Sequence, residues 1–222
     1  DEIKKDFKTR KSEYLINLDK FFDRDSIDPG YLYAILRQIE DMIRAKESFN
    51  DSEYVQILNL FDLVRKSGEA VEFKRSKAQS YLADWITVHK IITDILLDIL
   101  ATTKGSKLFK DNRANIFALI KYLFSINSSP DIEDDKRESS EPSHIAINSV
   151  RGQAFRALVQ FVYNDNDRAL AEDVKKLYEQ VLDTDSSNAV RFTIGQFFAS
   201  FYFRDIEFIK GLLPKIFPKA ED

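Results

Sequence analysis

The sequence predicts an all-α protein built from repeated helix hairpins, an α-solenoid of about eight to ten helices. Three observations predict this class. Apolar residues recur at helical spacing along most of the chain, and only five Pro and six Gly interrupt its 222 residues. A segment near the C-terminal end also repeats with a period of about 40 residues. We expect no β-strands.

The repeat is visible where Asn148-Ser149-Val150-Arg151 returns as Asn188-Ala189-Val190-Arg191. The residues that follow match apolar for apolar at the spacing of one helix face. The matched pairs are Val150 with Val190, Ala154 with Ile194, Ala157 with Phe197, Leu158 with Phe198, Phe161 with Phe201, and Val162 with Tyr202. An Asp-containing break and a second apolar segment follow each helix. We therefore expect two helix-turn-helix repeats over residues 143–222, with Phe198 in the core of the second.

The segment from Asp183 to Arg191, with its acidic turn before a Val-Arg pair, resembles the start of the first helix of a HEAT repeat. The resemblance covers about residues 143–217 and implies a HEAT-like (armadillo-type) solenoid, an architecture that serves many functions. In that family the Arg and the turn Asp form a polar ladder, which implies that Arg191 pairs with Asp183 or Asp185. The first copy has Ser143 and Ile145 at the acidic positions, so the resemblance implies no partner for Arg151. More weakly, Asn148 to Gly152 followed by a helix pair resembles repeats in the sensor regions of bacterial STAND-type NTPases.

The N-terminal region, residues 1–127, is expected to form antiparallel helix pairs. The expected helices are residues 2–22, which have a basic start, Pro29 to about Ile43, Asn50 to Gly68, 76–103, and Asp111 or Asn112 to Leu123. Pro29 is a start signal, and Asn50 with Glu53 forms a capping pair. Trp85 is expected in the core of the longest helix and His89 in the core or at its edge.

Residues 128–142 are acidic and polar, which predicts a flexible linker or loop. Asp131, Glu133 and Asp135 alternate as calcium-loop ligands do. Lys136 stands where that loop requires glycine, and Pro142 stands where it requires its bidentate Glu. We therefore predict no metal site.

The sequence contains no Gly-rich phosphate loop and none of the common hydrolase motifs, and its two histidines are fifty-five residues apart. We expect no catalytic residues, no cofactor and no enzymatic activity. The absence of Cys excludes thiolate chemistry and agrees with a cytoplasmic location. No apolar run approaches the ~20 residues that span a bilayer. Because the chain opens on Asp1 without an initiator Met, we expect a fragment of a larger protein.

These features favour a protein-interaction or scaffold module whose partner is another protein or a neighbouring domain of the parent chain. The candidate partner-binding residues are Arg151, Arg191, Phe208 and Leu212. The final segment, Ile206 to Phe217, is apolar on more than one side, so we expect an outward interface there and self-association of the isolated chain. Pro214 is expected to break this helix or to begin a new one.

One alternative is a nucleic-acid-binding HEAT-repeat domain, since some HEAT-repeat proteins, which this chain resembles in repeat length, grip the DNA backbone and a subgroup of them are alkylpurine DNA glycosylases. The basic first helix and Lys74-Arg75-Lys77 favour it, whereas the net charge of −4 and the pI near 5.4 oppose it. The other alternative is a sensor region of a STAND-type NTPase.

Overall fold

The structure is a computed structural model that describes residues 2–21, 29–47, 49–66, 83–126, 141–165, 169–185 and 187–217. All regular secondary structure in these ranges is α-helical, as the sequence predicts. The chain divides into two compact units, residues 1–119 and 120–222, and each is described by itself. The boundary falls inside a helix, a few residues before the end of the N-terminal region expected at 1–127.

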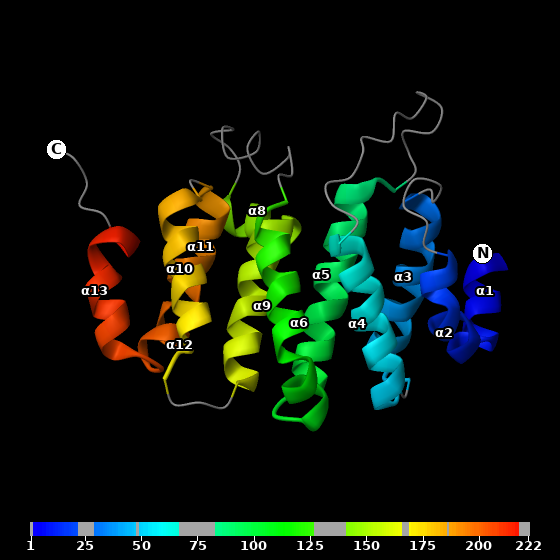
Figure 1. Ribbon diagram of the computed structural model, residues 1–222. Helices are drawn as coiled ribbons and strands as arrows, with labels where there is room; N and C mark the ends of the chain where they lie inside the picture. The colour runs from blue at the N-terminus through cyan, green and yellow to red at the C-terminus, as the bar shows by residue number, and fades with distance from the viewer. Residues whose placement is uncertain are drawn as a thin grey trace. The chain divides into compact units, whose positions relative to one another are not determined.

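The first unit contains α1 (Glu2–Thr9), α2 (Lys11–Phe21), α3 (Pro29–Arg44), α4 (Asp51–Lys66), α5 (Trp85–Thr102) and most of α6 (Lys107–Phe124). Helix α3 packs against both α1 and α5, and α2 packs against α4 (Figure 1). Their apolar stripes meet in a core whose largest fully buried side chains are Phe7, Leu15, Leu32, Leu36, Ile39, Ile57, Phe61 and Phe109. Each packed helix therefore buries one face, as its apolar spacing predicts.

Two helix starts in this unit follow the signals in the sequence. Pro29 is the first residue of α3, where its fixed φ suits a helix and its missing N–H is not needed. At the start of α4, the Asn50 side chain accepts a hydrogen bond from the N–H of Glu53 at 3.0 Å. The Glu53 carboxylate accepts one from the N–H of Asn50, also at 3.0 Å. This reciprocal capping box confirms the predicted pair.

Two other predicted boundaries are wrong. The single helix expected at the N-terminal end is interrupted at Arg10, which separates α1 from α2. Helix α5 begins at Trp85, because the Asp84 carboxylate accepts a hydrogen bond from the N–H of Thr87 at 2.8 Å and caps the helix there. Residues 76–82, where the helix was expected to start, lie outside the described residues.

Helix α6 also begins earlier than the sequence predicts, at Lys107 instead of Asp111 or Asn112. The Ser106 hydroxyl accepts a hydrogen bond from the N–H of Phe109 at 3.2 Å, which is the geometry of an N-cap. A serine before an apolar segment is therefore the signal that sets this start, and the later acidic and amide residues lie inside the helix.

The second unit contains α8 (Pro142–Asn148), α9 (Val150–Asn164), α10 (Glu172–Thr184), α11 (Asn188–Gln196), α12 (Phe198–Tyr202) and α13 (Ile206–Ile216). Helices α9 and α11 begin at the two copies of the repeated segment. Helix α11 packs against α8 and α9, and α13 packs against α10 and α12 (Figure 1). Each copy is thus followed by a second helix, α10 in the first and α13 in the second.

The described residues form twelve helices, more than the eight to ten expected. Breaks at Arg10 and Phe197 divide two expected helices, and α8 is an additional short helix before the first repeat. Residues 128–140 of the expected acidic segment, 128–142, lie outside the described residues. Asp131, Glu133 and Asp135, whose spacing resembles that of calcium ligands, are among them. The last residue of the segment, Pro142, is the first residue of α8.

Three aromatic rings from both repeats form the centre of the second unit. Phe155 of α9 lies 5.9 Å from the ring of Tyr178 and 5.6 Å from that of Phe201, and the last two rings are 4.8 Å apart. All three side chains are buried. Tilted ring pairs of this kind stabilise by about 0.5–1.5 kcal/mol each beyond the area they bury. We call these three residues the aromatic core.

All six repeated apolar positions are buried in the first copy, and three of the six are buried in the second. The buried residues are Val150, Ala154, Ala157, Leu158, Phe161 and Val162 in the first, and Val190, Ile194 and Phe201 in the second. Phe198 is only half-buried, so its expected place in the core is wrong. The reason is local, since α11 ends at Gln196 and the chain resumes as the short α12.

Helices α8 and α9 approach each other closely at Gly152. A Cβ built on Gly152 would lie 2.3 Å from the carbonyl oxygen of Ala146 and 2.8 Å from the Ser149 hydroxyl. That hydroxyl caps α9 by accepting a hydrogen bond from the N–H of Gly152 at 3.0 Å. The position therefore requires glycine. At Gly195 or Gly211, by contrast, a Cβ would have no atom of another element within 4 Å among the described residues.

Candidate interaction surface

Four aromatic side chains cluster on the outside of the second unit. The ring of Phe198 stacks on Tyr202 at 5.4 Å and meets Phe217 edge-on at 5.6 Å, and Phe203 packs against Tyr202 at 6.1 Å. Phe203 is 78% exposed and Phe217 is 57% exposed. We call these four residues the aromatic patch.

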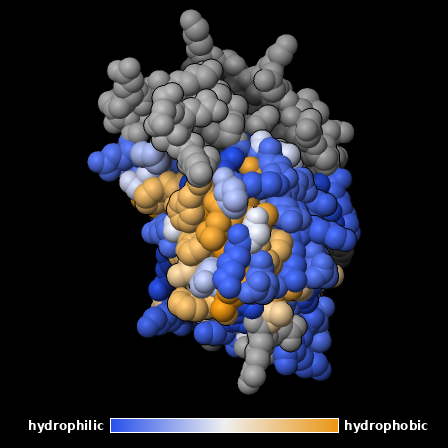
Figure 2. Space-filling view, turned by 90° about the vertical axis from the view of Figure 1, so that its left-hand side faces the viewer, coloured by the Kyte–Doolittle hydropathy of each residue, from blue (hydrophilic) through white to orange (hydrophobic). Residues whose placement is uncertain are grey.

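The patch continues onto one side of α13. Ile206 is exposed and Leu213 is half-buried, and helical spacing puts both on the side of α13 that carries Phe217. Figure 2 looks onto the side of the molecule where α13 lies and shows hydrophobic residues gathered on that face. Contiguous exposed apolar surface of this kind marks interaction sites in soluble proteins.

Two of the predicted partner-binding residues, Phe208 and Leu212, do not face outward. The ring of Phe208 lies 6.2 Å from that of Tyr178, and the Lys175 ammonium lies 5.6 Å from its centroid. Leu212 is 6% exposed. The Phe208 ring packs against Tyr178 of the aromatic core and Leu212 is buried, so the expectation that they are outward apolar residues is wrong.

Sequence reasoning did not single out Phe203, which follows the last residue of α12. A signal was present, because Phe201, Tyr202 and Phe203 are consecutive and three consecutive aromatic residues cannot share one helix face. Pro214 lies inside α13 and does not end it, contrary to the expected break. The helix therefore continues to Ile216.

The other predicted residues, Arg151 and Arg191, occupy equivalent positions in the two repeats but bind different groups. Arg151 forms an ion pair with Asp185, with Nη1 and Oδ2 3.3 Å apart and side chains only 12% and 7% exposed. The second carboxylate oxygen of Asp185 accepts a hydrogen bond from the N–H of Ser187 at 2.9 Å, just before α11. One aspartate thus links the start of the second repeat to the first helix of the first repeat.

Arg191 pairs with neither Asp183 nor Asp185, contrary to the ladder that the HEAT resemblance implies. Its Nη1 donates to the carbonyl oxygen of Lys215 at 3.0 Å, and its Nη2 donates to that of Leu182 at 2.9 Å. Asp185 is taken by the ion pair described above, and Asp183 pairs with the Lys215 ammonium at 2.7 Å. The guanidinium therefore lies on the electronegative C-terminal ends of α10 and α13.

Three of the basic residues at the start of the chain face carboxylates. The ion pairs are Lys8 with Glu47 at 2.9 Å, Arg10 with Glu13 at 2.6 Å, and Lys11 with Glu53 at 3.1 Å. These carboxylates reduce the positive potential that a phosphate-binding surface needs. Lys74-Arg75-Lys77, the other basic segment, lies outside the described residues.

A charged cluster fastens α3 to α5 in the first unit. Glu40 is fully buried and ion-pairs with Arg37 and with Arg44, whose Nη2 lies 2.6 Å from Oε1. The Nε of Arg44 also lies 3.5 Å from Oδ2 of Asp98 on α5. Burial, and next the charge of Glu40, raise the pKa of Asp94 to about 6. Two arginines thus stabilise the carboxylates of this cluster, which fits a structural role.

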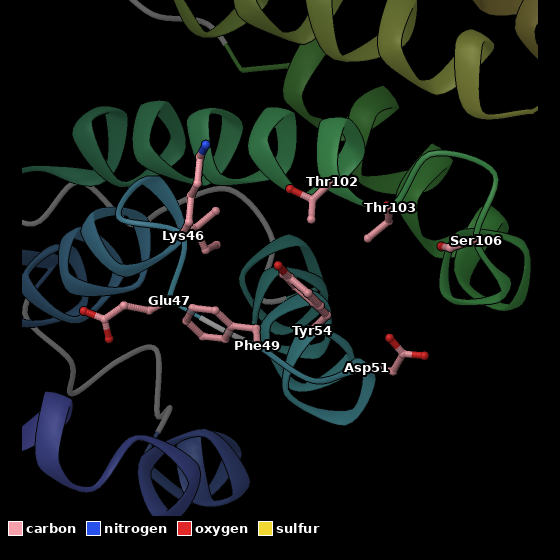
Figure 3. A pocket seen from close by; sticks show the side chains of 9 residues that line it. Lys46, Glu47, Phe49, Asp51, Tyr54, Thr102, Thr103 and Ser106 are labelled. Atoms are coloured by element: carbon pink, nitrogen blue, oxygen red, sulfur yellow. The ribbon is translucent and has the colours of Figure 1, made fainter.

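A pocket of about 400 Å³ lies between the turn after α3, the start of α4 and the end of α5 (Figure 3). The hydroxyls of Thr102 and Thr103 donate to the carbonyl oxygens of Asp98 and Ile99 in their own helix, both at 2.8 Å. The carboxylate of Glu47 is held by the ion pair described above. These polar groups are already engaged, so we assign no ligand to the pocket.

His89 is buried on α5, as the sequence predicts. Burial lowers the pKa of His89 to about 4 and keeps its imidazole neutral near pH 7. Its ring lies 6.4 Å from that of Trp85, which is half-buried at the helix start and not in the core as expected. Among the described residues, no group of three or more His, Asp or Glu side chains could hold a metal ion.

The helices in the described part of the chain are either too short or too polar to cross a membrane. Comparisons of the chain with known protein families, with curated proteins and with solved structures found no match.

Proposed function

We propose that this chain is a non-catalytic protein-interaction or scaffold module that binds a partner protein through the aromatic patch. The observation that carries the proposal is the exposure of Phe203 and Phe217, 78% and 57%, within a cluster of four touching rings. Burial of one such side chain stabilises by about 1.5–3 kcal/mol. Aromatic residues are also enriched among those that dominate binding energies.

In this proposal the two helix pairs of the second unit stack as HEAT-like repeats of a solenoid. The ion pair between Arg151 and Asp185 supports it, because it joins equivalent parts of consecutive repeats. The shared aromatic core supports it as well, since its rings come from both repeats. Repeats that bury their faces against neighbours leave an extended surface free for partners. A cytoplasmic location belongs to the same proposal and is supported by the absence of Cys.

The proposal is tested by photo-crosslinking in the host cell. A photoreactive phenylalanine analogue replaces Phe203 in one variant and Tyr31 in the control, because Tyr31 is 60% exposed in the first unit. We expect a discrete protein adduct from position 203 and none from position 31. A second variant, Phe217→Lys, should remove the adduct and leave the circular dichroism spectrum unchanged. Equal labelling at both positions, or none at 203, would contradict the proposal.

The nucleic-acid alternative has less support, because Lys8, Arg10 and Lys11 all face carboxylates. Binding to duplex DNA that weakens steeply between 50 and 200 mM salt, as phosphate contacts require, would favour it over the protein-interaction module. A sensor region of a STAND-type NTPase would also bind its ligand through an exposed face, so the crosslinking experiment addresses both hypotheses.

A further inference from the structure

The two repeats provide an internal comparison of a covered face with an uncovered one. Four positions with the same spacing follow the start of each copy. In the first copy they lie on one side of α9, and in the second they fall on α11 and, after the break at Phe197, on α12. They are Arg151, Phe155, Leu158 and Val162 in the first copy, and Arg191, Gly195, Phe198 and Tyr202 in the second. In the first copy the three apolar residues are buried and the arginine is 12% exposed. In the second copy Gly195 is exposed and the other three are partly exposed.

The second repeat supplies two of the groups that cover this side in the first. Asp185, in the turn before α11, binds the Arg151 guanidinium. Phe201 of α12 packs its ring 5.6 Å from that of Phe155. The covering element therefore has a carboxylate before its leading helix, α11, and an aromatic ring on α12, the short helix that follows.

The equivalent residues of the second repeat, Arg191 and Gly195, lack these two covering groups. The Arg191 guanidinium donates its hydrogen bonds to the carbonyl oxygens of Leu182 and Lys215. No carboxylate among the described residues lies within ion-pair distance of it. Gly195 stands where Phe155 stands in the first copy, and among the described residues a Cβ there would meet no atom of another element within 4 Å. Next to these positions lies the aromatic patch with its exposed rings.

We propose that this face binds a helix hairpin of a partner protein, with a carboxylate in the turn before its leading helix and an aromatic side chain that lies over Gly195. The carboxylate pairs with Arg191 as Asp185 pairs with Arg151, and the apolar side of the hairpin covers the aromatic patch. The inference rests on the proposed interaction function and specifies the chemistry of the partner.

A tethered hairpin of known sequence tests the geometry. The probe is the full chain with a copy of residues 185–217 inserted after Phe217, so that the aromatic patch stays complete and the copied Asp185 follows shortly after α13. If the hairpin docks, the midpoint of thermal unfolding should rise by about 4 °C or more. Dye binding to exposed apolar surface should also fall.

A double-mutant cycle then isolates the proposed ion pair. Asp185→Asn, made in the copy alone, should reduce the stability gain when Arg191 is present and have no effect beside Arg191→Gln. We expect a coupling of about threefold or more in the unfolding equilibrium constant. The control is Lys210→Gln, because Lys210 already pairs with Glu207 on α13 and should show no coupling to the copied aspartate.

An unchanged unfolding midpoint, or a rise without coupling to Arg191, would overturn the hairpin proposal. Sedimentation of the unextended chain as a dimer that Phe203→Lys converts to monomer would overturn it as well, since the occupant would be a second copy. In either case a discrete crosslink at position 203 would leave the proposed interaction function standing. Loss of that crosslink alone would contradict the function without affecting the tethered test.

Discussion

Gly152→Ala should destabilise the protein, although the same exchange in an ordinary helix stabilises by about 0.5–1 kcal/mol. The added methyl group would lie 2.3 Å from the carbonyl oxygen of Ala146 and 2.8 Å from the Ser149 hydroxyl. The carbonyl belongs to backbone, so α8 must move away from α9. Overpacking of this kind costs about 1–3 kcal/mol, and displacement of the Ser149 cap adds about 1 kcal/mol. After the helix-propensity gain is subtracted, we expect a net loss of about 1–3.5 kcal/mol.

The measurement is urea unfolding followed by circular dichroism, with two matched variants. Gly195→Ala and Gly211→Ala place the same methyl group in open space on α11 and α13, so they should stabilise by about 0.5–1 kcal/mol. A Gly152→Ala protein as stable as these two, or within about 0.5 kcal/mol of the parent chain, would refute the close approach of α8 and α9.

Phe201→Ala should lower the free energy of unfolding by about 3–5 kcal/mol, and Phe198→Ala by only about 1–2 kcal/mol because that ring is half-buried. Equal losses in urea titration would contradict this difference. Tyr178→Phe should leave stability unchanged or raise it by about 1 kcal/mol, because the buried hydroxyl has no recorded hydrogen-bond partner among the described residues. A loss above 1 kcal/mol in the same titration would indicate such a partner. Asp94→Asn should stabilise the protein at pH 7 and not at pH 4. The raised folded-state pKa of Asp94, about 6, means that its contribution to stability is fully present below about pH 4 and is lost as the pH rises through 6. His89→Gln should show the opposite pH dependence in thermal melts. The folded-state pKa of His89, about 4, gives the parent chain stability that is present above about pH 6.5 and lost as the pH falls toward 4. An effect of the substitution that does not change with pH would contradict the lowered pKa of His89.

Apolar spacing and capping residues were enough to predict the helical class, the start of α3 at Pro29 and the capping box at Asn50 and Glu53. They also predicted burial of Phe201. These features depend on residues a few positions apart, so the sequence carries them directly. Neither break, at Arg10 or at Phe197, falls at a Pro, and the local pattern did not predict them.

The aromatic patch lies near the C-terminal end, where the sequence predicts an interface, but its residues differ from the predicted ones. Phe208 and Leu212 are as apolar as Ile206 and Phe217, and only the direction from which α10 and α12 pack on α13 decides which pair is buried. Periodicity shows that α13 has more than one apolar side and cannot show which side is covered. The pairing of Arg151 likewise depends on contact with a turn 34 positions later in the chain.

The ion pair between Arg151 and Asp185 fixes the register of the two repeats. A slip of one helical turn, about 5.4 Å, would still leave apolar residues against apolar residues, but it would separate two largely buried charges. Separating such charges costs about 3–5 kcal/mol. The ion pair therefore disfavours the slipped arrangement, which hydrophobic packing alone would hardly distinguish from the native one. The pair also makes the repeats depend on each other, because α9 keeps its carboxylate partner only while the turn before α11 is folded. The amide hydrogens of α9 and α11 should then exchange with solvent through a common opening, with one free energy for both helices.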